Sequence, residues 1–150
     1  MVIRDILNMK GGAIFSVAPD GMVSDAVGMM VKNDIGSLVV MDDGRMVGML
    51  TFREVLMALN THSGNLSGLR VREVMVADAI SGSPDDTLDH LREVMTRNHV
   101  RYLPVMDAGQ LLGVISFHDV AKSVIKETSF ENRLLKRYIE NVPEAGEAHK

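Results

Sequence analysis

The sequence predicts a mixed α+β fold in which two β-α-β-β-α units pack sheet to sheet about a pseudo-twofold axis, followed by a C-terminal helix. The main evidence is an internal repeat: residues 14–55 align without a gap on residues 79–120, with 13 identities in 42 positions. The identities include backbone-constraining residues such as Gly48/Gly113. Each unit alone is close to the lower size limit for independent folding. We therefore expect the two units to share one module, with a symmetric pair of clefts between them.

Each unit opens with a short β-prone segment, at residues 14–17 and 79–81. Amphipathic helices are predicted next, over about 22–32 and 87–97, because apolar residues recur there at helical spacing. Their apolar stripes suit either the core of one molecule or a dimer interface. Three residues are candidates for the cap of the second of these helices: Asp85, Asp86 and Thr87.

Two apolar runs around a glycine-containing turn predict a β-hairpin in each unit. The runs are 35–41 with 46–50, and 100–106 with 111–115. A second helix is expected near Thr51 in the first unit and near Ser116 in the second. The latter continues into an apolar stripe from Phe130 to Ile139, which we expect to dock on the module or on a second copy. Fraying is expected from Asn141 onward.

These patterns divide the chain into four segments. The first unit is assigned to residues 1–59 and the second to residues 71–125. The polar, Gly/Ser-rich residues 60–70 are expected to form a linker between them. Residues 126–150 form the expected C-terminal helix and tail.

Composition excludes several function classes. The net charge of −4 gives no sign of a nucleic-acid-binding face. Apolar stretches are too short to span a membrane, and the N-terminus does not resemble a signal peptide, so we expect a cytoplasmic protein. The chain has no Cys, its five His residues are scattered, and its Met residues are core filler. We therefore expect no metal site, and no catalytic set is recognisable.

The residues best suited to bind a ligand lie at the two strand–helix junctions. Ser116 and Asp119 in one junction, and Thr51 and Glu54 in the other, match the pattern of a helix-capping box. The same geometry suits a nucleotide, because a helix N-terminus and a hydroxyl favour phosphate and a carboxylate can accept a ribose diol. Glu54 fits the capping box better, whereas Asp119 is the better candidate diol acceptor.

These segments, taken together, resemble a known protein family. The segments Pro84–Leu88, Arg101–Val105 and Gly113–Asp119, together with the repeat, are similar to the CBS domain. The tandem pair resembles a Bateman module over roughly residues 2–125. A terminal helix with Tyr138-Ile139 resembles small stand-alone bacterial CBS-pair proteins.

The resemblance implies a non-catalytic sensor that binds an adenosine nucleotide, such as AMP, ADP, ATP or NAD, between the repeats, with no cofactor required. It implies a first site made of Ser116, Asp119, His118, Ile14, Ile35, Gly36 and Ser37. It implies a second site made of Thr51, Glu54, Arg53, Ala79, Val100, Arg101 and Tyr102. In the second site Glu54 departs from the family's Asp.

Several alternatives stay open. Arg53 is either a phosphate partner or a solvated helix residue, and Arg101 stands where the first unit has Gly36. With few aromatic residues, adenine is expected to lie against aliphatic walls, with Tyr102 the one candidate for stacking. We expect a homodimer with neither nucleic-acid nor membrane partners, and the sequence names no regulated protein. The alternative function is a ligand-free dimerisation or interaction module.

Overall fold

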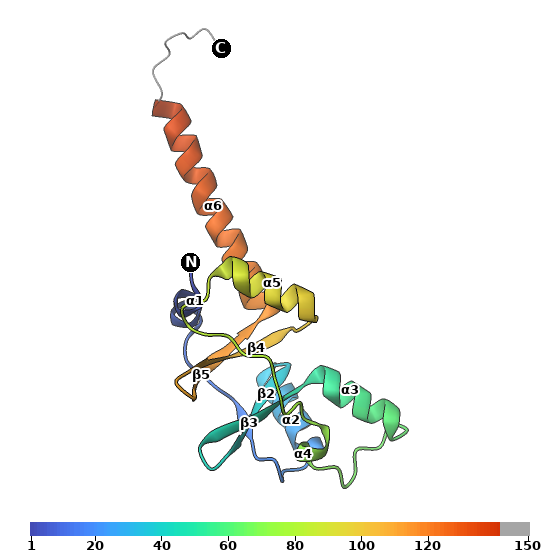
Figure 1. Ribbon diagram of the computed structural model, residues 1–150. Helices are drawn as coiled ribbons and strands as arrows, with labels where there is room; N and C mark the ends of the chain where they lie inside the picture. Colours follow the sequence, from blue (N-terminus) through green and yellow to red (C-terminus); the bar gives the residue numbers. More distant parts are fainter. Residues whose placement is uncertain (142–150) are drawn as a thin grey trace.

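The computed structural model describes residues 1–141 of the 150-residue chain. The expected fraying after Asn141 therefore falls outside the described residues. The chain forms two lobes that lie one above the other, and a long helix extends from the upper one (Figure 1).

The first lobe contains a three-stranded sheet in the order β1-β2-β3. Its elements are β1 (Ser16–Val17), α2 (Val23–Asn33), β2 (Ser37–Asp42), β3 (Arg45–Thr51) and α3 (Phe52–Thr61). The second lobe contains α5 (Leu88–Asn98), β4 (Tyr102–Asp107), β5 (Gln110–Ser116) and the start of α6 (Phe117–Asn141). Strand β3 of one lobe contacts β5 of the other, so the two sheets meet at the centre of the molecule.

The internal repeat extends to details of the backbone. Both hairpins turn through two residues with positive φ, as type I′ turns require: Asp43-Gly44 and Ala108-Gly109. The strand register shifts after Val40 in one hairpin and after Val105 in the other, at equivalent repeat positions. The helix over 87–97 is capped by Thr87, whose Oγ1 accepts a hydrogen bond from the backbone N–H of His90 at 3.1 Å. The predicted two-unit fold is thus confirmed.

The prediction of a strand over residues 79–81 is wrong. The second lobe has only an isolated bridge between Gly82 and Val105 where the first lobe has β1. The reason lies in the neighbouring strand. In the first lobe the N–H of Val39 donates to the Phe15 carbonyl at 3.0 Å, but the equivalent residue in the second lobe is Pro104, which has no N–H to donate.

The short helix that leads into each unit packs into the opposite lobe. Helix α1 (Ile3–Lys10) buries Ile3 and Ile6 in the core of the second lobe and packs against α6 and β5. Helix α4 (Val71–Val74) buries Val71 in the core of the first lobe, against α2 and α3. The lobes therefore differ from the continuous segments 1–59 and 71–125.

Glycines accommodate this exchange. A Cβ on Gly48 of β3 would lie 2.8 Å from the Val76 carbonyl oxygen, just after α4. The equivalent Gly113 of β5 lies under α1, and a Cβ there would lie 2.8 Å from a methyl group of Leu7. Each exchanged segment thus contacts the other lobe's sheet at a glycine, where an added Cβ would lie within 3 Å of it.

The segment expected to be a polar linker is partly folded. Helix α3 continues to Thr61, and Leu66 and Leu69 pack against the first core. The backbone N–H of Val71 donates to the Gly21 carbonyl at 2.8 Å, which ties the end of this segment to the first lobe.

The stripes on the two repeat helices belong to the cores of the molecule. Val23, Ala26 and Met30 of α2 are buried in the first core, and Leu88, Leu91 and Met95 of α5 are buried in the second. The alternative that these stripes form a dimer interface is thereby resolved in favour of the core.

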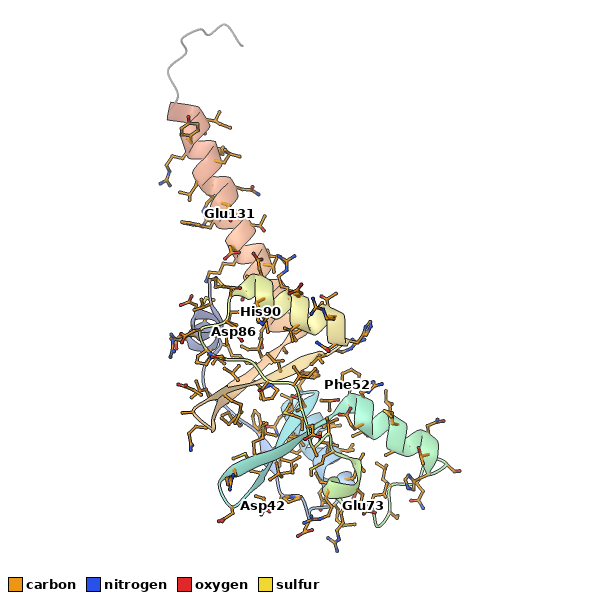
Figure 2. All side chains as sticks on the ribbon, in the orientation of Figure 1. Asp42, Phe52, Glu73, Asp86, His90 and Glu131 are labelled. Atoms are coloured by element: carbon orange, nitrogen blue, oxygen red, sulfur yellow. The ribbon has the colours of Figure 1, made fainter. Side chains whose placement is uncertain are left out.

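Helix α6 is a single helix of 25 residues. Its first turns bury Val120 against α1 and α5, but its outer half extends away from both lobes (Figure 1). The side chains around Glu131 project with no neighbouring element beside them (Figure 2). The stripe from Phe130 to Ile139 is exposed, so the expectation that it docks on its own module is wrong. No helix within residues 1–141 is long and apolar enough to cross a membrane.

Candidate ligand cavities between the lobes

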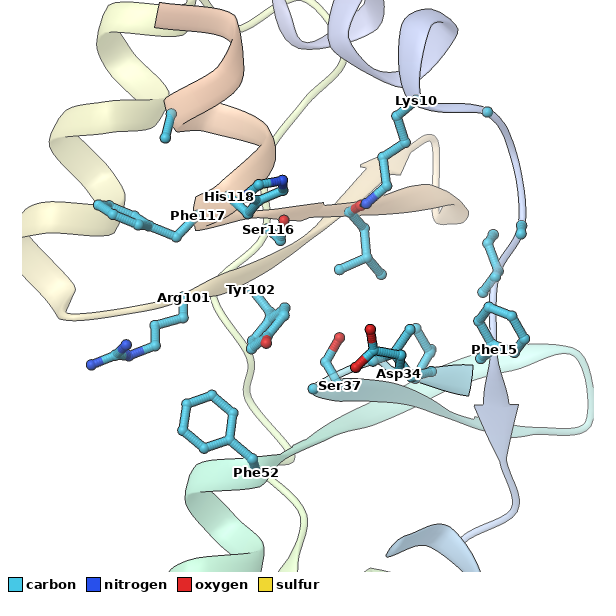
Figure 3. A pocket seen from close by; sticks show the side chains of 18 residues that line it. Lys10, Phe15, Asp34, Ser37, Phe52, Arg101, Tyr102, Ser116, Phe117 and His118 are labelled. Atoms are coloured by element: carbon cyan, nitrogen blue, oxygen red, sulfur yellow. The ribbon is translucent and has the colours of Figure 1, made fainter. Parts of the chain in front are cut away.

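Two cavities lie between the lobes at the places where the repeat predicts clefts. The first has a volume of about 720 Å³ and the second about 410 Å³. Both are in the 300–1,000 Å³ range of small-molecule sites. Phe52, Arg101 and Tyr102 line both cavities, so these three side chains form a shared wall. Figure 3 shows Tyr102 between His118 of the upper lobe and Ser37 of the lower one, with Arg101 and Phe52 beside it.

The structure brings most of the predicted first-site residues together. The first cavity is lined by Ile14, Ile35, Gly36, Ser37, Ser116 and His118. Asp119, predicted to contact ribose, does not line this cavity. Its carboxylate lies against α1, where Lys10 Nζ contacts Asp119 Oδ2 at 2.6 Å and also donates to the Val114 carbonyl at 2.8 Å.

All seven predicted second-site residues line the second cavity: Thr51, Arg53, Glu54, Ala79, Val100, Arg101 and Tyr102. They come from the start of α3 and from the segments that precede the second-lobe strands. The residues that the resemblance implies for the second site thus line one cavity, and their role in binding stays a prediction.

Both strand–helix junctions form capping boxes. Thr51 N–H donates to Glu54 Oε1 at 2.8 Å, and Ser116 N–H donates to Asp119 Oδ2 at 2.8 Å. Asp119 N–H returns a bond to Ser116 Oγ at 3.1 Å. The expectation that Glu54 fits the capping box better than Asp119 is therefore wrong, because the shorter Asp side chain still makes both bonds of the cap.

The helix N-termini have few free donors for a phosphate. At the start of α6, Phe117 N–H donates to the Arg101 carbonyl at 2.8 Å and Asp119 N–H is used by the cap. In the described part of the chain, only His118 among the first three N–H groups lacks a partner. Side-chain cations such as Lys10 and Arg101 therefore offer an anion more donors than this helix end does.

The Asp119 carboxyl has a perturbed pKa. Burial by itself raises this pKa, but hydrogen bonds from Lys10 and Ser116 and the charge of Lys10 outweigh burial. The pKa therefore lies below its usual value of 3.8. Asp119 is ionised at neutral pH and bound to Lys10.

Aromatic side chains form much of the first cavity. Phe15, Phe52, Tyr102 and Phe117 all line it, out of four Phe and two Tyr in the whole chain. The expectation of aliphatic walls, with Tyr102 as the one aromatic exception, is therefore wrong for this cavity. The few aromatic residues are concentrated at one place, where a planar base could pack against them.

The shared wall depends on a size difference between the repeats. Tyr102 packs edge-on against Phe52, with ring centroids 6.2 Å apart, and Arg101 lies 5.7 Å above the Phe52 ring. A Cβ at Gly36 would lie far too close to the Tyr102 hydroxyl. Small residues in the first unit therefore make room for large residues at the equivalent positions of the second. Burial raises the pKa of Tyr102 and Arg101 lowers it, with a net rise, so the hydroxyl stays protonated.

The first cavity has the more positive lining. Lys10 and Arg101 line it with one carboxylate, Asp34. In the second cavity, Arg53 and Arg101 face two carboxylates, Glu54 and Asp78. The first cavity is thus both larger and better suited to an anion.

Sequence reasoning missed Lys10, Phe15, Asp34 and Phe52 in the first cavity. Lys10 is the last residue of the lead-in helix, directly before Gly11-Gly12, and a cation at that place is the one available signal. Its role becomes visible only when α1 is placed on the second lobe.

Several known proteins are similar to this chain in sequence or in fold. The chain is 26% identical over 116 residues to the CBS domain-containing protein YhcV of Bacillus subtilis, which covers 77% of this chain and 82% of YhcV. The CBS-domain-containing protein ATU1752 from Agrobacterium tumefaciens superimposes with a TM-score of 0.79 at 31% identity, covering 82% of this chain and 98% of that one. CBSX2, whose structure is a complex with AMP, superimposes with a TM-score of 0.71 at 20% identity, covering 83% and 97%.

The family model for the CBS domain matches twice, at residues 3–61 and 71–126. These two matches correspond to the two units of the internal repeat and cover most of the chain. The fold, the repeat and the matches agree, and the chain belongs to the CBS domain family as a tandem pair.

Proposed function

We propose that this protein is a non-catalytic regulatory module that binds an adenosine nucleotide, such as AMP, ATP or NAD, between its two CBS domains. The observation that carries the proposal is the first cavity, about 720 Å³ in volume and lined by both aromatic and cationic side chains. A base can pack against Phe15 or Tyr102, while Lys10, Arg101 and His118 supply donors for phosphate.

The likeness to CBSX2 supports this ligand class, because that protein is seen in complex with AMP. Ser37 and Ser116 line the first cavity from opposite lobes. A nucleotide held between them would bridge the lobes and stabilise one packing of the pair. A second, weaker nucleotide site in the second cavity follows from its smaller volume and its two carboxylates.

A thermal-shift screen with AMP, ADP, ATP, NAD(H) and S-adenosylmethionine tests the proposal. A ligand that binds only the folded protein adds about 2.7 kcal/mol of stability at a hundredfold excess over its Kd. Ser37→Trp should block the first cavity and abolish most of the shift. The matched variant Ala79→Trp blocks the second cavity and should leave most of it. If none of the ligands raises the Tm of the wild-type protein, the proposal is wrong.

The exposed stripe on α6 favours a second function, as a dimerisation module. Five large apolar residues on the outer half are 47–68% exposed: Phe130, Leu134, Leu135, Tyr138 and Ile139. A protein that is dimeric by light scattering and shows no nucleotide response would support this function in place of sensing.

A further inference from the structure

A smaller cavity lies outside both clefts, where α1 packs against α6. Its volume is about 200 Å³. We call it the lysine groove, and its lining residues are Ile6, Met9, Lys10, Asp119, Lys122, Ser123 and Lys126. This volume is below the 300–1,000 Å³ of whole-ligand sites, so the groove has room for a small group only.

The groove has an excess of positive charge. It contains three ammonium groups and one carboxylate, and that carboxylate, Asp119, is bound to Lys10 at 2.6 Å. Among residues 1–141, Lys122 has no ion-pair partner, and Lys126 contacts only the weakly accepting sulfur of Met9, at 3.4 Å. Lys122 and Lys126 are also one helical turn apart, a spacing at which like charges destabilise a helix.

A buried hydroxyl provides the second, independent observation. Ser123 is only 4% exposed, yet it lines the groove. Its Oγ has no hydrogen-bond partner in the part of the chain that the structure describes. Because buried polar groups are nearly always hydrogen-bonded, this hydroxyl indicates a missing partner in the groove that Lys122 and Lys126 also line.

We propose that the lysine groove binds a phosphoryl group, held by Lys122, Lys126 and the hydroxyl of Ser123. Lysine binds phosphate as a point charge, whereas a carboxylate is matched best by the planar fork of arginine, and no arginine lines the groove. The phosphoryl group is either free inorganic phosphate or the terminal group of a nucleotide in the first cavity. The second source rests on the proposed function, and Lys10, which lines both spaces, connects them.

Isothermal titration calorimetry in a low-salt, phosphate-free buffer tests this site with three probes: inorganic phosphate, AMP and ATP. The test variant is the double substitution Lys122→Ala/Lys126→Ala. The matched control is Lys136→Ala/Arg137→Ala, which removes the same charge from the outer half of the same helix. Neither pair lines the two nucleotide cavities, so AMP affinity should change in neither variant.

We expect the test variant to lose about tenfold in affinity for the phosphoryl probe, on the scale of two partly screened charge-assisted contacts. The control should lose less than about twofold. Ser123→Ala, which keeps all charges, should also weaken binding. If inorganic phosphate is the weakened probe, the source is free phosphate, and this result holds even if no nucleotide binds.

If only ATP is weakened, with AMP unchanged, the source is the nucleotide tail. If inorganic phosphate does not bind and ATP is unaffected by the test variant, or if the control loses as much as the test variant, the proposal is overturned. If inorganic phosphate binds but neither AMP nor ATP does, the proposed function is contradicted, while the phosphoryl site in the lysine groove is still supported.

Discussion

Asp119 illustrates how a single side chain serves two purposes at the centre of the molecule. Its carboxylate caps α6 through Ser116 N–H and also holds Lys10 at the end of α1. It thereby connects a helix of the second unit with the lead-in of the first. A nucleotide that used Asp119 for its ribose would have to compete with Lys10 for this carboxylate.

The pH dependence of stability tests this role. The folded-state pKa of Asp119 is depressed, so its contribution is present above the usual value of 3.8 and is lost as the pH falls through the folded pKa. Asp119→Asn should lower the unfolding free energy by about 1–2 kcal/mol at neutral pH. Urea unfolding between neutral pH and about pH 3 should show this gap closing as the pH falls. A gap of constant size would contradict the ion-pair explanation.

At the residue scale, prediction from sequence succeeded where the repeat placed two copies in equivalent positions. Thr51 and Glu54 line the second cavity, and the equivalent Ser116 and Asp119 of the second unit made this pair recognisable in the sequence. It failed for Lys10 and Asp34, which have no recognisable partner motif. Their place depends on contacts between segments distant in the chain, and local patterns contain no information about those contacts.

At the scale of the elements, the contacts of the exchanged segments α1 and α4 can be compared through two glycines, Gly113 and Gly48. Gly48→Ala places a methyl group 2.8 Å from the backbone oxygen of Val76, which cannot move without shifting the segment after α4. Gly113→Ala meets only the end of the Leu7 side chain, which can rotate. We expect a loss of about 2 kcal/mol for Gly48→Ala and less than about 1 kcal/mol for Gly113→Ala, measured by chemical denaturation. Equal losses would show that the backbone contact is not the limiting one.

The outer half of α6 is the element most in need of a partner, because an isolated helical arm of this length is marginally stable in water. Its stripe is self-complementary. In an antiparallel pair centred between Leu134 and Leu135, Phe130 of one copy would face Ile139 of the other. We therefore expect the second copy of this chain to cover it.

Leu134→Glu/Leu135→Glu should convert a dimer into a monomer in light-scattering measurements, since it places carboxylates in the apolar contact. Lys136→Glu changes the net charge by the same two units away from the stripe and should leave the dimer intact. If the wild-type chain is monomeric at all concentrations, the pairing is wrong.

The strands and helices were largely predictable, because glycine turns and helical spacing are local signals. The missing second-lobe strand was not, since Pro104 acts on a neighbour more than twenty residues earlier in the chain. The projection of α6 was also not predictable, because an amphipathic stripe has the same pattern whether its partner is the same molecule or another one.

At the scale of the whole molecule, the shared wall links the two cavities. Arg101 lines both, and one guanidinium cannot neutralise two phosphates at once. We expect two nucleotides to bind with negative coupling, the second about five- to tenfold more weakly than an independent site would. Arg101→Ala should weaken the first event and reduce the coupling in calorimetric titrations.

Lys10→Ala provides the comparison, because Lys10 lines the first cavity and not the second. Lys10→Ala should weaken the first binding event. It should not reduce the negative coupling between the two events, because that coupling depends on Arg101. Two identical, independent binding events in the wild-type protein would contradict the shared-wall mechanism.

The exchange of α1 and α4 also has a topological consequence. Each lobe completes its core with a segment from the other repeat, so the chain has the architecture of a domain-swapped dimer joined into one polypeptide. Neither half contains a whole core of its own. Each half therefore needs the other to complete its core, and a ligand bound between the lobes would act on two halves that are already entwined.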